Sequence, residues 1–574
     1  MKEFLSYLKP YKRDAVLAVF CIEAETVFEL IIPLVMASIV DVGVATGDRH
    51  YILMKGLQMV LFALISLVLG QGSAMFSARC GQGLGAEIRK AEFAKLQQFS
   101  FANTDHFSSS SLVTRLTSDV TTIQNSVAAG MRPAFRSPVM MLTAMAASFY
   151  INPQLAMVFL VAAPVLGALL FFIISRVRPL YSVMQGAIDM VNRIIQENLT
   201  AIRVVKSYVR GDHEIRKFEE VNYNLRFTAE KAFRLAVLNM PAMQLVMYST
   251  ILCILWFGGR LVTIGGVKVG ELTGFLSYVL QVLNSLMMFS NVFLMTTRAL
   301  ASWKRISEVM SEEIDIKEDG SSPLEVEHGD IRFEHVYFKY NQDAAEYVLS
   351  DISFHIKAGQ TVGIIGQTGA AKSTLVQLIP RLYDVTNGTV YIDGRPVREY
   401  PLKRLRDSIA MVLQKNTLFS GTVKDNLRWG RETATDQEIE EACRIACVDE
   451  FIDRLERGYE TELGQGGINV SGGQKQRLCI ARAILKSPKV LILDDSTSAV
   501  DTATEAKIRD GLAKSMPDTT KIIIAQRISS VVHADQIIIL EDGRVNAVGS
   551  HETLLASNQI YQDIYHSQQE GANL

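Results

Sequence analysis

Residues 361–374 of this 574-residue chain read TVGIIGQTGAAKST. The apolar run that begins at Thr361 predicts a strand. The Gly-rich turn after it is typical of a loop whose backbone N–H groups surround phosphates at a helix N-terminus. A helix is expected to follow over 374–382. In such a loop Lys372 would meet the β- and γ-phosphates of a nucleotide, and Ser373 would bind Mg²⁺. The stretch therefore predicts an α/β domain with a P-loop.

One position departs from the P-loop pattern. Ala371 stands where the last glycine is expected, and its methyl group could crowd the phosphates. The loop residues expected to contact the nucleotide are Gly366, Gln367, Thr368, Gly369, Ala370, Ala371, Lys372, Ser373 and Thr374.

Two further stretches support a phosphate site in this half. The apolar strand 490–493 runs directly into Asp494, which would place a carboxylate beside the metal. Residues 470–477 read VSGGQKQR.

Strands alternate with helical patterns in this half of the chain, which indicates a largely parallel sheet. The other strands are expected at 362–365, 409–413, 521–524 and 536–540.

The segment VSGGQKQR resembles the signature sequence of ATP-binding cassette (ABC) proteins, and the resemblance extends over nearly the whole chain. It implies one subunit of an exporter in which a membrane domain is fused to a nucleotide-binding domain, with ATP and Mg²⁺ as cofactors. In that family two cassettes form a head-to-tail dimer. Each ATP lies between one chain's P-loop and the other chain's signature.

The resemblance also implies roles for single residues. Tyr340 is similar to the aromatic residue that stacks on adenine, and the alternative for it is cross-strand packing. Gln414 resembles the glutamine that contacts Mg²⁺, so the implied metal ligands are Ser373, Gln414 and Asp494. The signature residues implied to act on the partner's ATP are Ser471, Gly472, Gly473 and Gln474.

Two residues expected to take part in ATP hydrolysis differ from the family pattern. Asp495 stands where the family usually has Glu, which orients or deprotonates the attacking water. Gln526 stands where the family usually has His. Gln can hydrogen-bond a phosphate but cannot change charge near neutral pH. Displacing a water-orienting carboxylate by about 1 Å can cost on the order of 10²-fold in rate. Both residues could be tolerated variants, but two coincident losses favour an impaired site.

Six apolar stretches precede residue 300, each long enough or nearly so to cross the ~30 Å hydrocarbon core as a helix. The second and fourth connections between them are long and hold most of the basic residues. The positive-inside bias therefore places these connections and both termini in the cytoplasm of a cell, with a bacterial plasma membrane expected. The connections are expected to be helices with reversals near 105–114 and 208–213. The six spans are expected at residues 15–40, 52–76, 133–150, 155–174, 238–257 and 272–295.

Two groups of membrane residues are candidates for substrate contact. Carboxylates at membrane depth are costly, so they are expected either to attract a cationic substrate or to pair with a neighbouring helix. Met and Phe side chains in the sixth stretch would suit an adaptable apolar cavity, although ordinary helix packing explains them almost as well. The two groups are Glu23, Glu25 and Glu29, and Met287, Met288, Phe289 and Phe293.

Composition limits the remaining possibilities. Hydrophobic residues make up 49% of the chain, which excludes a disordered or fibrous protein. Residues 1–322 hold 30 basic against 25 acidic residues and residues 323–574 hold 28 against 35, so nucleic acid is not an expected partner. The six cysteines are scattered and are expected to be reduced thiols. We expect an all-α transmembrane domain at 1–310, a linker at 311–328 and an α/β nucleotide-binding domain at 329–574.

An intact signature beside an impaired P-loop site predicts half of a heterodimeric ABC exporter. The chain would bind ATP in a site with weak or no hydrolysis, and its signature would complete the partner's active site. Small amphipathic or hydrophobic compounds are the expected cargo, moved across a lipid bilayer. The alternatives are a homodimeric lipid or peptide exporter, an ATP-gated regulator or channel that does not pump, and an importer subunit, which the fused domain order disfavours.

Overall fold

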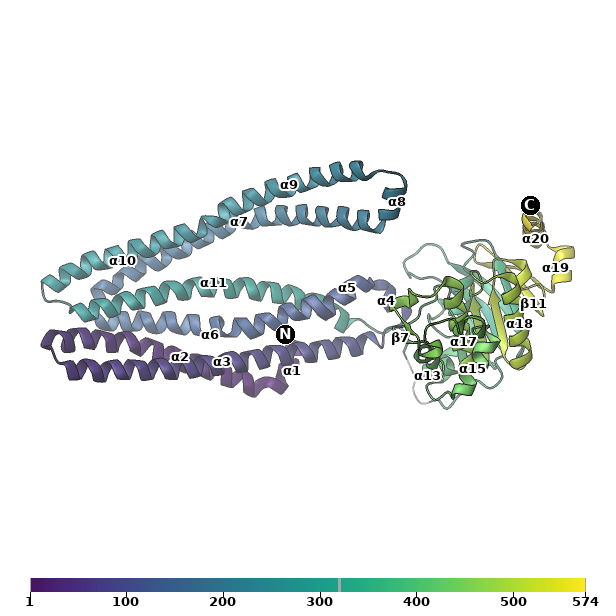
Figure 1. Ribbon diagram of the computed structural model, residues 1–574, viewed down its shortest axis with the longest axis horizontal. Coiled ribbons are helices and arrows are strands. Elements are labelled where there is room, and N and C mark those ends of the chain that lie inside the picture. Colours follow the sequence, from purple (N-terminus) through teal and green to yellow (C-terminus); the bar gives the residue numbers. More distant parts are fainter. Residues whose placement is uncertain (1, 318–321, 573–574) are drawn as a thin grey trace. The chain divides into compact units, whose positions relative to one another are not determined.

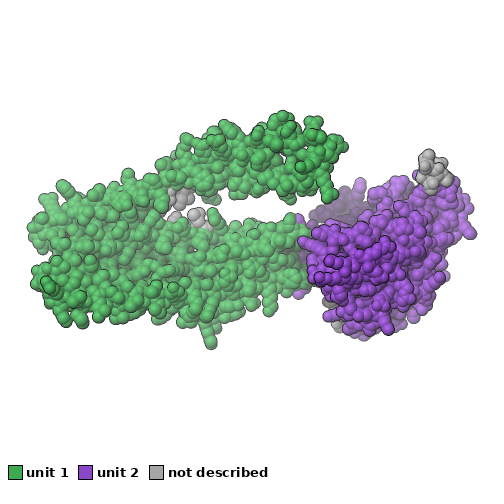
Figure 2. Space-filling model, in the orientation of Figure 1, with its two compact units in different colours: residues 1–97, 109–311 green, residues 98–108, 312–574 purple. Residues whose placement is uncertain are grey.

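The computed structural model describes residues 2–317 and 322–572, so residues 318–321 of the expected linker lie outside the described residues. The chain divides into two compact units, which Figure 2 shows in different colours. The first unit comprises residues 1–97 and 109–311, and the second comprises 98–108 and 312–574. The short segment 98–108 thus groups with the second unit although the chain on both sides of it belongs to the first.

The described part of the first unit is helical. The longest helices, α3 and α7, each contain 48 residues, or about 72 Å at 1.5 Å per residue. Both therefore extend far beyond a ~30 Å hydrocarbon core. The elements are α1 (Lys2–Leu8), η1 (Lys9–Tyr11), α2 (Lys12–Ser38), η2 (Ile39–Val44), α3 (Arg49–Leu96), α5 (Ser109–Thr114), η3 (Arg115–Asp119), α6 (Val120–Ile151), α7 (Pro153–Thr200), α8 (Ile202–Ser207), α9 (Gly211–Val237), α10 (Asn239–Thr263) and α11 (Val269–Ser311).

Within this unit the helices form two groups (Figure 1). Helices α2, α3, α6 and α11 pack side by side, whereas α7 pairs with α9 and α10. The start of α11 is fixed to the first group by polar contacts. The backbone N–H groups of Gly270 and Glu271 donate to Asp41 at 2.6 and 3.1 Å, and the Tyr278 hydroxyl donates to the Leu30 carbonyl at 2.6 Å.

Each of the six predicted spans lies within a helix or a pair of consecutive helices. By length and composition, five stretches among the described residues are long and apolar enough to cross a membrane. The predicted span 133–150 is the one outside that set. It lies in α6, where Arg132 and Arg136 flank and interrupt the apolar run. The five stretches are Ser6–Val44, Arg49–Leu96, Pro164–Thr200, Gly211–Thr263 and Val269–Ser311.

The second unit combines two main sheets with helices. Its six-stranded sheet has the order β12-β11-β3-β10-β9-β6, in which all strands except β12 run parallel, so the predicted parallel sheet is confirmed. A four-stranded antiparallel sheet has the order β2-β1-β4-β5, and β7 pairs with β8. The strands are β1 (Ile331–Phe338), β2 (Leu349–Ile356), β3 (Thr361–Gly366), β4 (Asn387–Ile392), β5 (Arg395–Pro396), β6 (Ile409–Val412), β7 (Gly421–Thr422), β8 (Glu462–Leu463), β9 (Val490–Asp494), β10 (Thr520–Ile524), β11 (Gln536–Glu541) and β12 (Arg544–Gly549).

Helices cover the parallel sheet, and short helical turns connect the rest of this unit. The helices are α4 (Phe101–His106), α12 (Lys372–Gln377), α13 (Leu402–Ser408), α14 (Val423–Arg428), α15 (Asp436–Ile445), α16 (Asp449–Ile452), α17 (Gly472–Leu485), α18 (Thr502–Ser515), α19 (His551–Ser557) and α20 (Gln559–Ala572). The short turns are η4 (Val397–Glu399), η5 (Gly458–Glu460), η6 (Gln465–Gly467) and η7 (Ile528–Ser530).

The core of this unit lies on both faces of the parallel sheet. Successive side chains of a strand point to opposite faces, and β9 follows this rule. Its Val490 and Ile492 pack in one apolar cluster, whereas Leu491 and Leu493 pack in another. Because the carboxyl ends of parallel strands share one edge, the ends of β3, β10 and β9 meet there, which is where ligands of such sheets bind.

Candidate nucleotide site and membrane cavities

The P-loop leaves β3 at Gly366 and enters α12 at Lys372. A Cβ at Gly366 would lie 2.2 Å from the Leu540 carbonyl oxygen, so only glycine fits at this turn. The Lys372 ammonium donates to the carbonyl oxygens of Gly366 and Gln367, each at 2.8 Å. Burial lowers the pKa of Lys372, and the carboxylates of Asp495 and Asp494 oppose that shift. The positive charge of the loop thus faces both carboxylates.

The candidate metal ligands converge at the end of β9. The Ser373 hydroxyl donates to Asp494 at 3.0 Å. Asp494 is 2% exposed, and its burial raises the pKa of the carboxyl while the bond from Ser373 opposes the shift. The Gln414 side chain hydrogen-bonds Asp495, which leaves its amide oxygen as a ligand. Hydroxyl, carboxylate and amide oxygens are hard ligands of the kind that Mg²⁺ binds, so these residues fit the ion.

Ala371 has a backbone conformation that favours glycine. It caps α12 with φ 64° and ψ 25°, in the left-handed region. Its methyl group packs against the apolar cluster beneath the loop. The alanine therefore strains the backbone of the loop as well as adding bulk near the expected phosphate position.

Asp495 and Gln526 form one hydrogen-bonded pair. The Gln526 amide donates to the Asp495 carboxylate at 2.9 Å, and the Gln414 side chain also bonds that carboxylate. Burial raises the pKa of Asp495, while the bonds from Gln414 and Gln526 oppose the shift. A carboxylate engaged by two amides has less capacity left to orient a water molecule.

Tyr340 lies beside the P-loop helix, whereas the signature lies at the N-terminus of α17. The Tyr340 hydroxyl is 2.9 Å from the Thr374 hydroxyl of the P-loop helix, and 48% of the residue is exposed. Ser471 caps α17, where its side chain accepts from the Gln474 N–H and its own N–H donates to the Gln474 amide oxygen. This helix start exposes N–H donors of the kind that bind phosphate.

Tyr383, which the sequence did not indicate as a site residue, lies next to the residues expected to bind the nucleotide. Its ring lies 5.2 Å from the Tyr340 ring and 5.8 Å from that of Phe101 in α4, in edge-to-face arrangements. Its hydroxyl donates to Asp105 of α4 at 2.6 Å, and burial raises the pKa of that hydroxyl. The helix α4 is therefore linked through one aromatic residue to the expected adenine-stacking position.

Two of the three membrane carboxylates form ion pairs with α6. Glu25, which is 3% exposed, pairs with Arg132 and lies 3.6 Å from Arg136, and Arg136 also pairs with Glu29. Glu23 is half-buried on the same helix. Glu25, Glu29 and Arg132 line a cavity of about 500 Å³ between α2, α3 and α6. These pairs match the expectation that the carboxylates pair with a neighbouring helix. Attraction of a cationic substrate stays a prediction.

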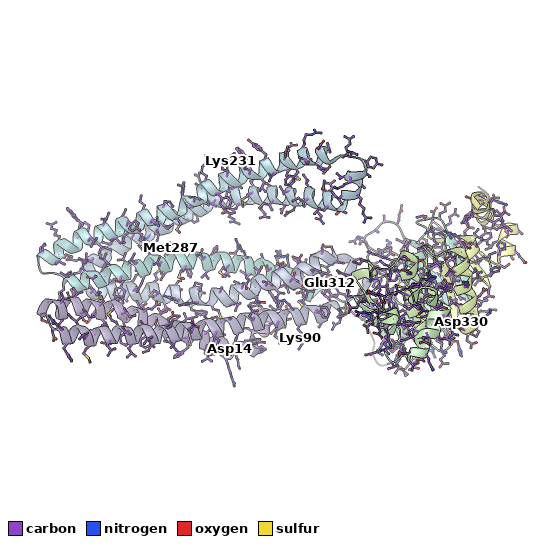
Figure 3. All side chains as sticks on the ribbon, viewed as in Figure 1. Asp14, Lys90, Lys231, Met287, Glu312 and Asp330 are labelled. Carbon is purple, nitrogen blue, oxygen red and sulfur yellow. The ribbon has the colours of Figure 1, made fainter. Side chains whose placement is uncertain are left out.

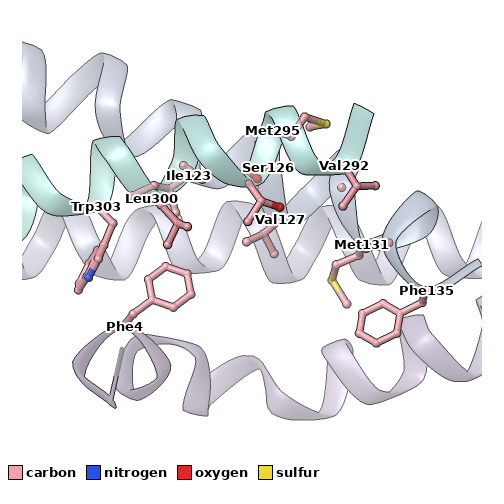
Figure 4. A pocket seen from close by; sticks show the side chains of 14 residues that line it. Phe4, Ile123, Ser126, Val127, Met131, Phe135, Val292, Met295, Leu300 and Trp303 are labelled. Atoms are coloured by element: carbon pink, nitrogen blue, oxygen red, sulfur yellow. The ribbon is translucent and has the colours of Figure 1, made fainter. Parts of the chain in front are cut away.

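A second cavity in this unit is apolar and has a volume of about 320 Å³ (Figure 4). It lies among α1, α6 and α11, with Phe4 and Trp303 in edge-to-face contact at one end. Met131, Phe135 and Met295 line it further along.

The predicted substrate residues of α11 lie outside the lining of this cavity. Met287, labelled in Figure 3, packs against the apolar core of the helical unit. The exposed fractions of Met288, Phe289 and Phe293 are 45%, 51% and 72%. From α11 the cavity is instead lined by Val292, Met295, Thr296, Ala299, Leu300 and Trp303.

Comparisons with known proteins agree with this arrangement. Residues 15–286 match the model of the ABC transporter transmembrane region, and residues 349–498 match that of the ABC transporter domain. The chain is 40% identical to YfiB of Bacillus subtilis, an uncharacterized ABC transporter ATP-binding protein, over 99% of this chain and 98% of that one. It is 31% identical to a putative multidrug export ATP-binding/permease protein of Staphylococcus aureus, over 98% and 99%.

A bacterial Atm1-family ABC exporter solved with ATP bound has the same fold, with a TM-score of 0.83, 24% identity and coverage of 97% of this chain and 99% of that one. The fold and the site define an ABC transporter, and the chain belongs to that family. Its particular form is a half-transporter with the exporter fold, in which one transmembrane domain precedes one ATP-binding domain.

Proposed function

We propose that this chain is the degenerate-site subunit of a heterodimeric ABC exporter. The observation that carries the proposal is the Gln526–Asp495 hydrogen bond at 2.9 Å, which engages the shortened carboxylate with a group that cannot titrate. The chain's own site binds Mg-ATP through Lys372, Ser373 and Asp494 and hydrolyses it slowly or not at all. Its signature at Ser471 completes the partner's active site.

The position of the carboxylate supports slow hydrolysis. Phosphoryl transfer depends on positioning and electrostatics, so the group that orients water must reach the γ-phosphate. Asp495 is one methylene shorter than Glu and is already bonded by two amides. The partner subunit would supply Glu and His at the corresponding positions, and hydrolysis would take place mainly there.

Several features support export of small amphipathic or hydrophobic compounds. The cavity beside Phe4 and Trp303 is apolar, and Met131 and Met295 give it adaptable walls. A relative that is 31% identical is named a putative multidrug export protein. The basic long connections favour a cytoplasmic position for the ATP-binding domain.

ATPase measurements on the purified full chain, alone and with its partner, test the proposal. We expect the partner to raise activity at least about tenfold, because only the partner's site orients the water well. In the complex, Asp495→Asn should lower activity only modestly, whereas the corresponding Glu→Gln change in the partner should nearly abolish it. Equal loss in both variants would show that the site here is catalytic.

The contribution of the signature has its own variant. Ser471→Arg adds bulk and charge at the N-terminus of α17, where the partner's γ-phosphate is expected. It should nearly abolish ATPase activity of the complex. Near-normal activity would contradict the trans assignment. Brisk ATPase of the chain alone would favour the homodimeric alternative, and failure to move substrate uphill in vesicles would favour an ATP-gated channel.

A further inference from the structure

The helix α20 packs against the segment that carries Gln526. Its Tyr561 is fully buried in an apolar cluster that also contains Ile365, Ala525 and Ile528. Ile365 directly precedes the P-loop, and Ala525 directly precedes Gln526. The helix thus lies on the two chain segments that leave the sheet toward the phosphates.

Gln568 of α20 makes two hydrogen bonds to the backbone on either side of Arg527. Its amide nitrogen donates to the Gln526 carbonyl at 2.7 Å, and its amide oxygen accepts from the Ile528 N–H at 2.8 Å. A side-chain amide offers one acceptor and two donors, so it can bridge a carbonyl and an N–H two residues apart. The bridge fixes the backbone from which the Gln526 side chain extends.

Fixing this backbone has a consequence for the Asp495 carboxylate. Gln526 is exposed, and a long exposed side chain loses rotamer freedom when it is held in one geometry. A preset backbone reduces the range of positions that the amide samples around Asp495 and, when ATP is bound, around the γ-phosphate. Asp495 in turn faces Lys372 of the P-loop.

We propose that Gln568 is a positioning residue for the Asp495–Gln526 pair, so that α20 sets how firmly this chain's own site retains Mg-ATP. The inference rests on the proposed function, because retention matters most in a site that turns ATP over slowly. Gln568 acts through Gln526, and its loss should have no effect once the Gln526 amide is absent.

A double-mutant cycle on the full-length chain in lipid nanodiscs tests this coupling. The measured quantity is the release rate of a fluorescent ATP analogue with Mg²⁺, chased with unlabelled ATP. Methionine keeps the length of glutamine and removes its polar groups. We expect Gln568→Met and Gln526→Met each to speed release by about fivefold, the effect of losing hydrogen bonds of ordinary strength. The double variant should release no faster than Gln526→Met.

Two further variants separate positioning from general stability. Gln569→Met changes the adjacent residue of α20, which bonds only Tyr565 among the described residues, and should release the analogue at the wild-type rate. Gln568→Glu keeps the acceptor for Ile528 and loses the donor to Gln526, and should also speed release. It provides the cycle if the methionine variant does not fold.

Two outcomes would overturn the proposal. One is an unchanged release rate in Gln568→Met and Gln568→Glu. The other is a Gln568 effect of equal size in the Gln526→Met background, which would mean that α20 acts on the site generally. Brisk ATPase activity of the wild-type chain alone would instead contradict the proposed function. The coupling between Gln568 and Gln526 would then be measured from the kcat values of the same variants.

Discussion

Ala371 holds a left-handed backbone conformation in the loop that receives the phosphates. For a residue with a Cβ this conformation costs roughly 1–2 kcal/mol. Ala371→Gly should relax the loop, and because it also removes the methyl group near the expected phosphates, Mg-ATP binding should tighten by about threefold. Ala371→Val should weaken binding, because a β-branched residue tolerates this conformation poorly. Equilibrium titration with a fluorescent ATP analogue measures both affinities, and weaker binding in the glycine variant would contradict crowding of the phosphates by the methyl group.

Because the Gln526 amide does not titrate, its contribution to ATP retention should not change with pH. A histidine at this position would make that contribution depend on pH. An ordinary His has a pKa of about 6.5. Below that pKa the imidazolium donates a charged hydrogen bond toward phosphate, and this contribution is lost as the pH rises through it. In Gln526→His the release of Mg-ATP should therefore become faster from pH 6 to pH 8, relative to wild type. Parallel pH profiles would show that residue 526 does not contact the nucleotide.

At the residue scale the sequence predicted which residues form the nucleotide site, but not which other residues hydrogen-bond to them. Lys372, Ser373 and Asp494 follow from a motif whose spacing fixes its geometry, and Ser373 does bond Asp494. The bond from Gln568 to Gln526 joins residues 42 positions apart and follows no motif. Such contacts depend on how elements pack, and periodicity says nothing about which glutamine reaches which carbonyl.

At the scale of elements, ion pairs join α2 to α6. Glu25 is buried and Arg136 contacts both Glu25 and Glu29, so removing the Glu25 charge leaves two arginines with one carboxylate. Breaking a fully buried pair costs about 3–5 kcal/mol. The Arg132 side chain is 42% exposed, so the cost here is smaller, but Glu25→Gln should still lower the thermal unfolding temperature in nanodiscs. Glu23→Gln on the same helix is the matched control and should have little effect. Similar losses in both variants would contradict a specific role for the pairs.

The elements themselves were predicted with different success. The five predicted strands of the parallel sheet were confirmed because each is a short apolar run next to a turn. The antiparallel sheet of β1, β2 and β4 was not predicted, because β1 pairs with β4 across the intervening β2, β3 and P-loop, and sequence pattern does not indicate such a pairing. Likewise, segment 98–108 carries no sequence signal for the Tyr383–Asp105 contact that joins it to the second unit.

At the scale of the whole molecule, the charge bias predicts which ends of the helices face the cytoplasm. In a Cys253→Ala background, which removes an exposed thiol, Thr46→Cys and Ser207→Cys mark opposite ends of the helical unit. A membrane-impermeant maleimide should label Thr46→Cys in intact cells. It should label Ser207→Cys only in inside-out vesicles. The reverse pattern would invert the topology and place the ATP-binding domain outside.

The fixed start of α11 has a mechanical consequence. The helix has 43 residues and no proline, and hydrogen bonds to Asp41 and Leu30 hold its first turns. A rigid rod about 65 Å long that pivoted near Gly270 would act as a lever. A pivot of only 5° at that end displaces the far end at Ser311 by about 6 Å, more than one helical turn. Near the far end, Ser302 and Arg305 each donate to Asp119 at 2.8 Å, so a stroke of this size requires those bonds to break.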